Sequence, residues 1–178
     1  AHILKLGFPG GPVIDKVARS GNPQAVKFPR PLLSGQSLDF SFSGVKTAVL
    51  YHVNGVPGGR RNQDDRRPRG IETFSPQEVA DVAASFQAAV VDVLRTKLRR
   101  AARLTAARTL VIGGGVAANS ALRAAASELA DKLHCTLRMP PMKYCVDNAA
   151  MIAGLGYHLL GAGRLADLDL EARATVKR

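Results

Sequence analysis

The sequence predicts an α/β fold, and the order of elements in its second half carries that prediction. Apolar segments at 109–112 and 135–139 have the length and composition of short strands, the first of them buried. Helical patterns cover 117–133, between the two strands, and 147–160, after the second. Alternation of strand and helix at this spacing is typical of an α/β layer in which consecutive strands pair in parallel.

Length and composition fit one globular domain, or one lobe of a larger protein. The 178 residues are 46% hydrophobic, which favours a packed core over disorder. No apolar run reaches roughly 18 residues, so no transmembrane helix and no membrane partner are expected. The first residues lack the basic and apolar regions of a signal peptide, and no initiator Met precedes them. We therefore expect a chain that begins within a gene or has been processed.

The chain is strongly basic. Its 25 Lys and Arg against 14 Asp and Glu give a formal net charge of +11, which suits a polyanionic partner. The alternative is an Arg-rich surface that serves solubility alone. Two cysteines, Cys135 and Cys145, are too few for a disulfide framework, so a reducing, cytoplasmic compartment is expected.

The first half of the chain is punctuated by turns. Residues 7–12, Gly-Phe-Pro-Gly-Gly-Pro, predict a turn, and a short helix is predicted over 13–18. Residues 39–43 alternate polar and apolar side chains, which predicts a half-buried strand. A helix is predicted to follow over 45–53.

Residues 54–70 differ in composition from their surroundings. They show no apolar periodicity and contain five arginines and two aspartates. We interpret them as a mobile basic insertion on the surface. Two roles stay open for it, a solvated spacer or a contact with nucleic acid.

A long amphipathic helix is predicted from a start signal at Ser75-Pro76-Gln77-Glu78 to about residue 106. Ser is a favoured N-cap, Pro is favoured at the first helical position, and an acid suits the first turn. The last part of this helix carries Arg95, Arg99 and Arg103 at i, i+4 spacing, which places them on one face. Cations stabilise a helix C-terminus, and that explanation stands beside a contact with phosphates.

The segment from Val111 to Arg123 is the most informative part of the chain. Three glycines, 113–115, interrupt the predicted strand, and a helix is predicted directly after them. Backbone without Cβ atoms can approach a ligand closely, and a helix N-terminus offers unpaired N–H groups to an anion. The sequence therefore predicts a nucleotide or phosphate cradle at the carboxyl end of a strand. Neither the P-loop pattern nor Gly-x-Gly-x-x-Gly fits, which leaves a nucleotide site of another architecture.

Asp147 opens the last predicted helix. As an N-cap it would accept N–H bonds from the first turn and stabilise the helix by about 1 kcal/mol. An ionised carboxylate at the end of an element is also a typical ligand of a hard metal ion. One carboxylate does not make a metal site, and the four histidines show no i, i+4 pair, so both interpretations stay open.

Four motifs carry a resemblance to a known family. In order within residues 7–153 they are Gly-Phe-Pro-Gly-Gly-Pro, Asp-Phe-Ser-Phe-Ser-Gly-Val-Lys-Thr-Ala, Gly-Gly-Val-Ala-Ala-Asn-Ser-Ala-Leu-Arg and Asp-Asn-Ala-Ala-Met-Ile-Ala. Together they resemble the C-terminal half of the tRNA threonylcarbamoyladenosine transferase family, called TsaD in bacteria and formerly labelled O-sialoglycoprotein endopeptidase or glycoprotease. The resemblance implies a ribonuclease H-like lobe of the actin, Hsp70 and sugar-kinase (ASKHA) fold over residues 1–178. It further implies that this lobe is incomplete at its N-terminus and that the N-terminal lobe is absent from the chain.

The resemblance also implies an activity and partners. Family members transfer threonylcarbamoyl from threonylcarbamoyl-AMP to the adenosine beside the anticodon of certain tRNAs. The implied partners are tRNA, threonylcarbamoyl-AMP or ATP/ADP, and the other subunits of a threonylcarbamoyladenosine synthesis complex. The alternatives are a metallopeptidase, as the older label says, and a non-catalytic nucleotide-binding or assembly module of the same fold. A metallopeptidase would want a segment such as His-Glu-x-x-His, which the sequence lacks.

The resemblance assigns nucleotide or substrate contacts to five positions. They are Gly11 and Asp15 for the adenylate, Asn119 for the nucleotide, and Gly114 and Gly115 near its phosphate. The connection at 54–70 is usually shorter in the family, and its five arginines motivate the hypothesis of a tRNA contact there.

Asp147 matches a ligand of the family's catalytic metal, one divalent ion described as iron or zinc. The two other ligands are a His pair in His-x-x-x-His in the N-terminal half, so Asp147 alone should hold metal weakly. We predict that the 178-residue chain is inactive by itself. Acyl transfer from a mixed anhydride needs a polarised carbonyl, which a metal supplies, and an amine held in line, which a cleft between lobes supplies. Neither requirement needs a protein nucleophile, and no catalytic residue beyond the metal ligand is assigned.

Overall fold

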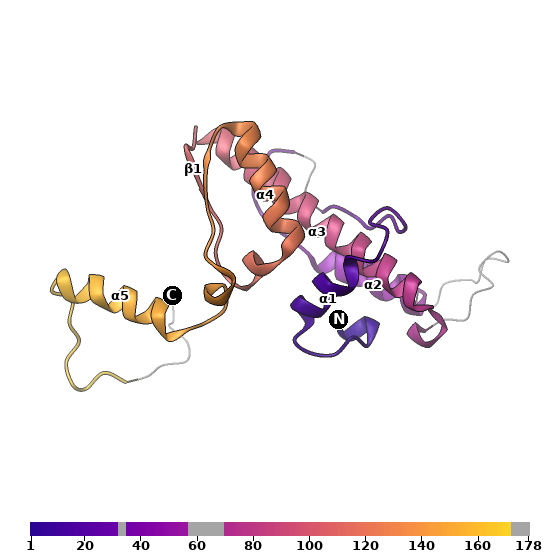
Figure 1. The fold of residues 1–178 in the computed structure, drawn as a ribbon, viewed down its shortest axis with the longest axis horizontal. Coiled ribbons are helices and arrows are strands. Elements are labelled where there is room, and N and C mark those ends of the chain that lie inside the picture. The colour runs from indigo at the N-terminus through magenta and orange to yellow at the C-terminus, as the bar shows by residue number, and fades with distance from the viewer. Residues whose placement is uncertain (32–34, 57–69, 172–178) are drawn as a thin grey trace. The chain divides into compact units, whose positions relative to one another are not determined.

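A computed structural model describes residues 1–31, 35–56 and 70–171 (Figure 1). Its contacts divide the chain into two units, 1–145 and 146–178, each described by itself. The described part of the first unit contains α1 (Gly10–Ala18), α2 (Ser43–Asn54), α3 (Pro76–Leu104), β1 (Thr109–Val111), α4 (Ser120–Leu133), β2 (Thr136–Arg138) and the short 3-10 helices η1 (His2–Leu4), η2 (Ile71–Thr73), η3 (Gly115–Ala118) and η4 (Met142–Tyr144). In the second unit it contains α5 (Ala149–Gly161).

The helix α3 is the central element of the first unit, and its start confirms the sequence prediction. Ser75 Oγ accepts a hydrogen bond from Glu78 N at 3.2 Å, and Ser75 N donates to Glu78 Oε2 at 2.9 Å, which completes a capping box. Its apolar face packs against α1, α2 and α4. The main core consists of Leu4, Ile14, Ala18, Phe28, Val45, Val49, Val53, Val82, Ala83, Ala84 and Ala89.

The strands β1 and β2 pair in parallel, with Leu110 opposite Leu137, as the alternation of elements predicts. The prediction that the first strand is buried is correct for Leu110 alone. This side chain packs with Ala102 of α3 and Ala130 of α4, whereas Val111, which points to the opposite face, is 73% exposed. Parallel sheets normally have both faces covered. In the described residues only one face of this sheet is covered.

The predicted strand over 39–43 is wrong. Residues 39–42 have an irregular backbone, and Ser43 already belongs to α2. Asp39 N donates to Ser37 Oγ at 3.0 Å, and the rings of Phe40 and Phe42 stack with centroids 6.1 Å apart. An alternating pattern makes a strand only when a neighbouring strand supplies hydrogen bonds, and no described strand lies beside this segment.

Helix boundaries differ from the predictions by a few residues. α1 includes the predicted helix 13–18 but begins at Gly10, so the second half of the predicted turn 7–12 is helical. α2 contains the predicted helix 45–53. α4 begins after an Asn cap rather than at 117, because η3 occupies the first residues of the predicted helix.

The described residues on the two sides of the basic insertion lie next to each other. α2 ends at Asn54, and the N–H of Gly70 donates to the carbonyl of Val53 at 3.0 Å. Residues 57–69, which carry the arginines, lie outside the described residues. The predicted mobility of the insertion therefore stays a prediction.

The helix α5 of the second unit is strongly apolar, and none of its residues is buried. Its exposed side chains include Met151, Ile152, Leu155, Tyr157 and Leu160. Among the described helices, α5 included, none combines the length and apolar character that crossing a membrane requires.

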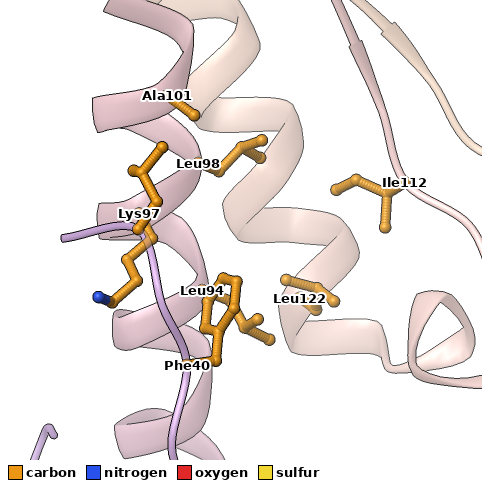
Figure 2. A pocket seen from close by; sticks show the side chains of 8 residues that line it. Phe40, Leu94, Lys97, Leu98, Ala101, Ile112 and Leu122 are labelled. Atoms are coloured by element: carbon orange, nitrogen blue, oxygen red, sulfur yellow. The ribbon is translucent and has the colours of Figure 1, made fainter. Parts of the chain in front are cut away.

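A cavity of about 270 Å³ lies in the first unit between α3, α4 and the segment around Phe40 (Figure 2). Its lining is Leu38, Phe40, Leu94, Lys97, Leu98, Ala101, Ile112 and Leu122. Lys97 is the one charged residue of this lining, is 1% exposed, and donates from Nζ to the carbonyl of Ser37 at 2.9 Å. None of the residues predicted to contact a nucleotide lines this cavity.

Candidate nucleotide site

The glycine loop follows β1 directly, as predicted. Ile112 N still donates to the carbonyl of Arg138 at 3.0 Å, and the sheet ladder ends there. Gly114 has φ +81° and ψ 176°, a backbone conformation that is essentially restricted to glycine. A Cβ added at any of the three glycines would meet nothing within 4 Å, so the space beside this backbone is open.

The loop continues into η3, and η3 leads into α4. Ala117 N donates to the carbonyl of Gly114 at 2.9 Å, and Ala117 is completely buried, which fixes the loop to the protein. The first N–H groups of η3 have no acceptor within that helix. An open, N–H-lined backbone after a strand can hold an anion such as a phosphate.

Asn119 is the N-cap of α4 and also connects three helices. Its Oδ1 accepts from Leu122 N at 2.9 Å, which satisfies one free donor of the helix. Its Nδ2 donates to Asp15 Oδ1 of α1 at 3.2 Å and to Gln87 Oε1 of α3 at 2.6 Å. The side-chain amide therefore uses its two N–H groups and its oxygen inside the protein.

Asp15 is buried where α1 meets the N-terminus of α4. Its Oδ1 accepts from Ser120 Oγ at 2.7 Å and from Ser120 N at 3.2 Å, in addition to Asn119. Its Oδ2 accepts from the exposed Arg19 at 3.2 Å. A carboxylate at a helix N-terminus is favourable electrostatically, so this arrangement stabilises the contact between Asp15 and the start of α4.

Gly11 lies one turn before Asp15 on α1, so the two residues share a helix face. A Cβ at Gly11 would meet nothing within 4 Å. The structure thus brings Asp15 and Asn119 into contact, with Gly11 on the same side of α1. The loop with Gly114 and Gly115 reaches Asn119 through η3.

Gln87 is a member of this network that sequence reasoning missed. It is half-buried on α3 and lies between the apolar positions Phe86 and Val90 of the predicted core face. A polar residue on the inward face of an amphipathic helix normally has a buried hydrogen-bond partner. That pattern is the signal that could have identified it.

Asp147 lies in the second unit and is exposed. Of the two interpretations of Asp147, the helix cap is wrong, because Asn148 is the N-cap of α5 and accepts from Met151 N at 3.0 Å. Within the described ranges, no group of three or more His, Cys, Asp or Glu residues is placed to hold a metal ion. The described residues by themselves do not fit a metal centre.

These features define a class of protein: an α/β unit with a parallel strand pair and a glycine loop with open space beside its backbone. Residues 1–154 match the family model described as "TsaD: tRNA N6-adenosine threonylcarbamoyltransferase". The chain therefore belongs to this family.

Curated relatives agree with this assignment. The chain is 48% identical over 175 residues to the tRNA N6-adenosine threonylcarbamoyltransferase of Trichlorobacter lovleyi, a match that covers 98% of this chain and 47% of the relative. It is 44% identical over 177 residues to the protein of the same name from Thermosipho africanus, with 99% and 49% covered. For the protein of that name from Clostridioides difficile the identity is 43%, with 99% and 48% covered. The chain thus spans about half the length of these relatives.

Proposed function

We propose that this chain supplies the nucleotide-binding half of a tRNA N6-adenosine threonylcarbamoyltransferase. The observation that carries the proposal is the contact of Asp15 with Asn119, which lie 104 positions apart in the sequence, beside an open glycine loop. Membership of the family supports tRNA as the substrate that is modified. The α/β architecture with its parallel strand pair is compatible with the ribonuclease H-like lobe of the ASKHA fold.

The phosphate of threonylcarbamoyl-AMP would lie against the backbone of Gly114 and Gly115, where the N–H groups that begin η3 can donate to it. Asp15 Oδ2 accepts a single described hydrogen bond, from the exposed Arg19, so it has capacity for a ribose hydroxyl. Gly11 leaves room for the nucleotide on the same face of α1.

Asn119 would contribute mainly through the hydrogen bonds by which it links α1 and α3 to the start of α4. Its three hydrogen-bonding groups are already used, so a direct contact with the nucleotide requires the exchange of one of them. The nucleotide would most simply replace Gln87 as the partner of Nδ2. Gln87 belongs to α3, and the packing of α3 against α1 and α4 holds that helix in place without this hydrogen bond.

In the proposed reaction N6 of the tRNA adenosine bonds to the carbamoyl carbon, the bond from that carbon to the phosphate oxygen breaks, and a proton leaves N6. AMP is the leaving group, and negative charge develops on its phosphate. N–H groups of the glycine loop would stabilise that charge without reorganising, which is an efficient form of electrostatic catalysis. The reaction needs no covalent intermediate with the protein.

A divalent metal, iron or zinc, stays part of the proposal with Asp147 as the one ligand that this chain offers. As the family resemblance implies, its further ligands would be the His-x-x-x-His pair of the N-terminal half. Other subunits of a cytoplasmic complex remain the proposed partners. A second candidate is a nucleotide-binding or assembly module of the same fold without transferase activity.

An activity assay separates the two candidates. The purified chain is incubated with threonylcarbamoyl-AMP and a tRNA transcript, alone and together with the N-terminal half of the Trichlorobacter lovleyi relative. The modified nucleoside is then measured by mass spectrometry after digestion. We expect no product from the chain alone and product from the combined halves. Product from the chain alone would refute the prediction that it is inactive by itself, and no product from a combination that forms a stable complex would favour the module.

A further inference from the structure

The C-terminal part of α3 carries a concentration of positive charge that the nucleotide site does not explain. Residues 93–104, the last part of α3, contain five basic and no acidic side chains. Arg95, Arg99 and Arg103 are exposed, and their i, i+4 spacing places them on one face of the helix. We call these three residues the arginine face.

Pairing with acidic groups leaves most of this charge uncompensated. Arg95 lies 3.6 Å from Asp92, but Asp92 also accepts two hydrogen bonds from Arg30, at 3.0 and 3.1 Å. One carboxylate is thus shared by two guanidinium groups. Within the described residues, no ion pair is formed by Arg99 or Arg103.

Stabilisation of the helix end explains only part of the pattern. The effect of the helix dipole is confined to the last turn, and α3 ends at Leu104. Arg103 lies in that turn, whereas Arg99 lies more than one turn before the end and Arg95 more than two. Two of the three arginines therefore lie outside the range of this effect.

We propose that the arginine face binds the phosphate backbone of tRNA. This inference rests on the proposed function, which makes tRNA the substrate. Three residues at i, i+4 spacing extend over about 12 Å. With the spacing of about 3.4 Å per phosphate along one strand of duplex DNA as a guide for an RNA duplex, this face spans about three phosphates. Arginine suits such a surface because its guanidinium group pairs with phosphate oxygens in a bidentate way.

The test measures binding of a fluorescent unmodified tRNA transcript to the chain across salt concentrations. The test variant is R95Q/R99Q/R103Q, and Gln has nearly the helix propensity of Arg. The control variant, K5Q/K16Q/K27Q, removes the same charge from exposed lysines in the first 31 residues. A third variant, R95K/R99K/R103K, keeps the charge, and circular dichroism checks the helix content of each.

Loss of three phosphate contacts should flatten the slope of log affinity against log salt by about 2 to 3. The affinity ratio of wild type to test variant should then shrink about 15- to 60-fold between about 50 and 200 mM salt. The control and lysine variants should keep nearly the wild-type slope. If the test variant keeps the wild-type slope while the wild type binds, the arginine face is not a tRNA surface. If the wild type itself does not bind tRNA, the proposed substrate and this inference fail together.

Discussion

Replacement of Asn119 by Asp perturbs the contact between α1 and α4 with little change of shape. The variant keeps Oδ1, so the cap of Leu122 N remains, but the Nδ2 donor becomes a second carboxylate oxygen. That oxygen would lie 3.2 Å from Asp15 Oδ1 and 2.6 Å from Gln87 Oε1. Three acceptors would then face one another without a hydrogen between them.

The size of the effect follows from these distances. Two unit charges 3.2 Å apart repel by about 5 kcal/mol at an effective dielectric constant of about 20. Rotation of the side chains and entry of water relieve part of this repulsion, so we expect N119D to lower the free energy of unfolding by about 2–4 kcal/mol. The loss should diminish as the pH falls far enough to protonate one of the two carboxylates, because the folded variant then binds a proton more readily than the unfolded chain.

Urea unfolding followed by circular dichroism at several pH values measures this effect. S75A is the control for the loss of a helix cap, since it removes a cap from α3 away from the network and should cost about 1 kcal/mol at neutral pH. An N119D variant as stable as the wild type, or one whose loss does not change between about pH 7 and pH 4, would refute the assignment of Asn119 as the connection between the helices.

Three further predictions concern single residues. Gly114→Ala should lower the free energy of unfolding by about 1–3 kcal/mol in urea unfolding, because Gly114 has a positive φ. The same variant should bind phosphate more weakly, which calorimetric titration with ADP would measure. Lys97→Met should leave the free energy of unfolding within about 1 kcal/mol of wild type or raise it, since it removes a buried charge; a loss above about 2 kcal/mol would contradict this. Asp147→Asn should change the free energy of unfolding by less than about 0.5 kcal/mol, whereas Asn148→Ala should cost about 1 kcal/mol, because Asn148 is the cap.

Features set by neighbouring residues were predictable from the sequence. The start of α3 depends on Ser75 and Glu78, which lie three residues apart, and the parallel pairing of β1 with β2 follows from the order of the elements. The start of α5 was predicted one residue early, because Asp and Asn are almost equally good caps and stand side by side at 147 and 148.

Features that depend on distant residues could not be predicted in this way. Nothing in the local pattern indicates that Asp15 meets Asn119 or that Gln87 joins them, because these contacts arise only when three helices pack. The predicted strand over 39–43 failed for the same reason, since a strand depends on a partner that the segment itself does not encode. The five nucleotide positions came from the resemblance to a family, and the structure supplies the geometry by which they can be tested.

The most direct test of the nucleotide site is a titration of the ¹⁵N-labelled chain with ADP, followed by NMR. We predict that the largest shifts occur at the backbone amides of Gly114, Gly115 and Val116 and at the side-chain amide of Asn119, and that Asp15→Asn weakens the binding. Shifts confined to residues that line the apolar cavity, such as Leu98 and Ile112, or saturable binding that leaves the glycine loop unchanged, would contradict it.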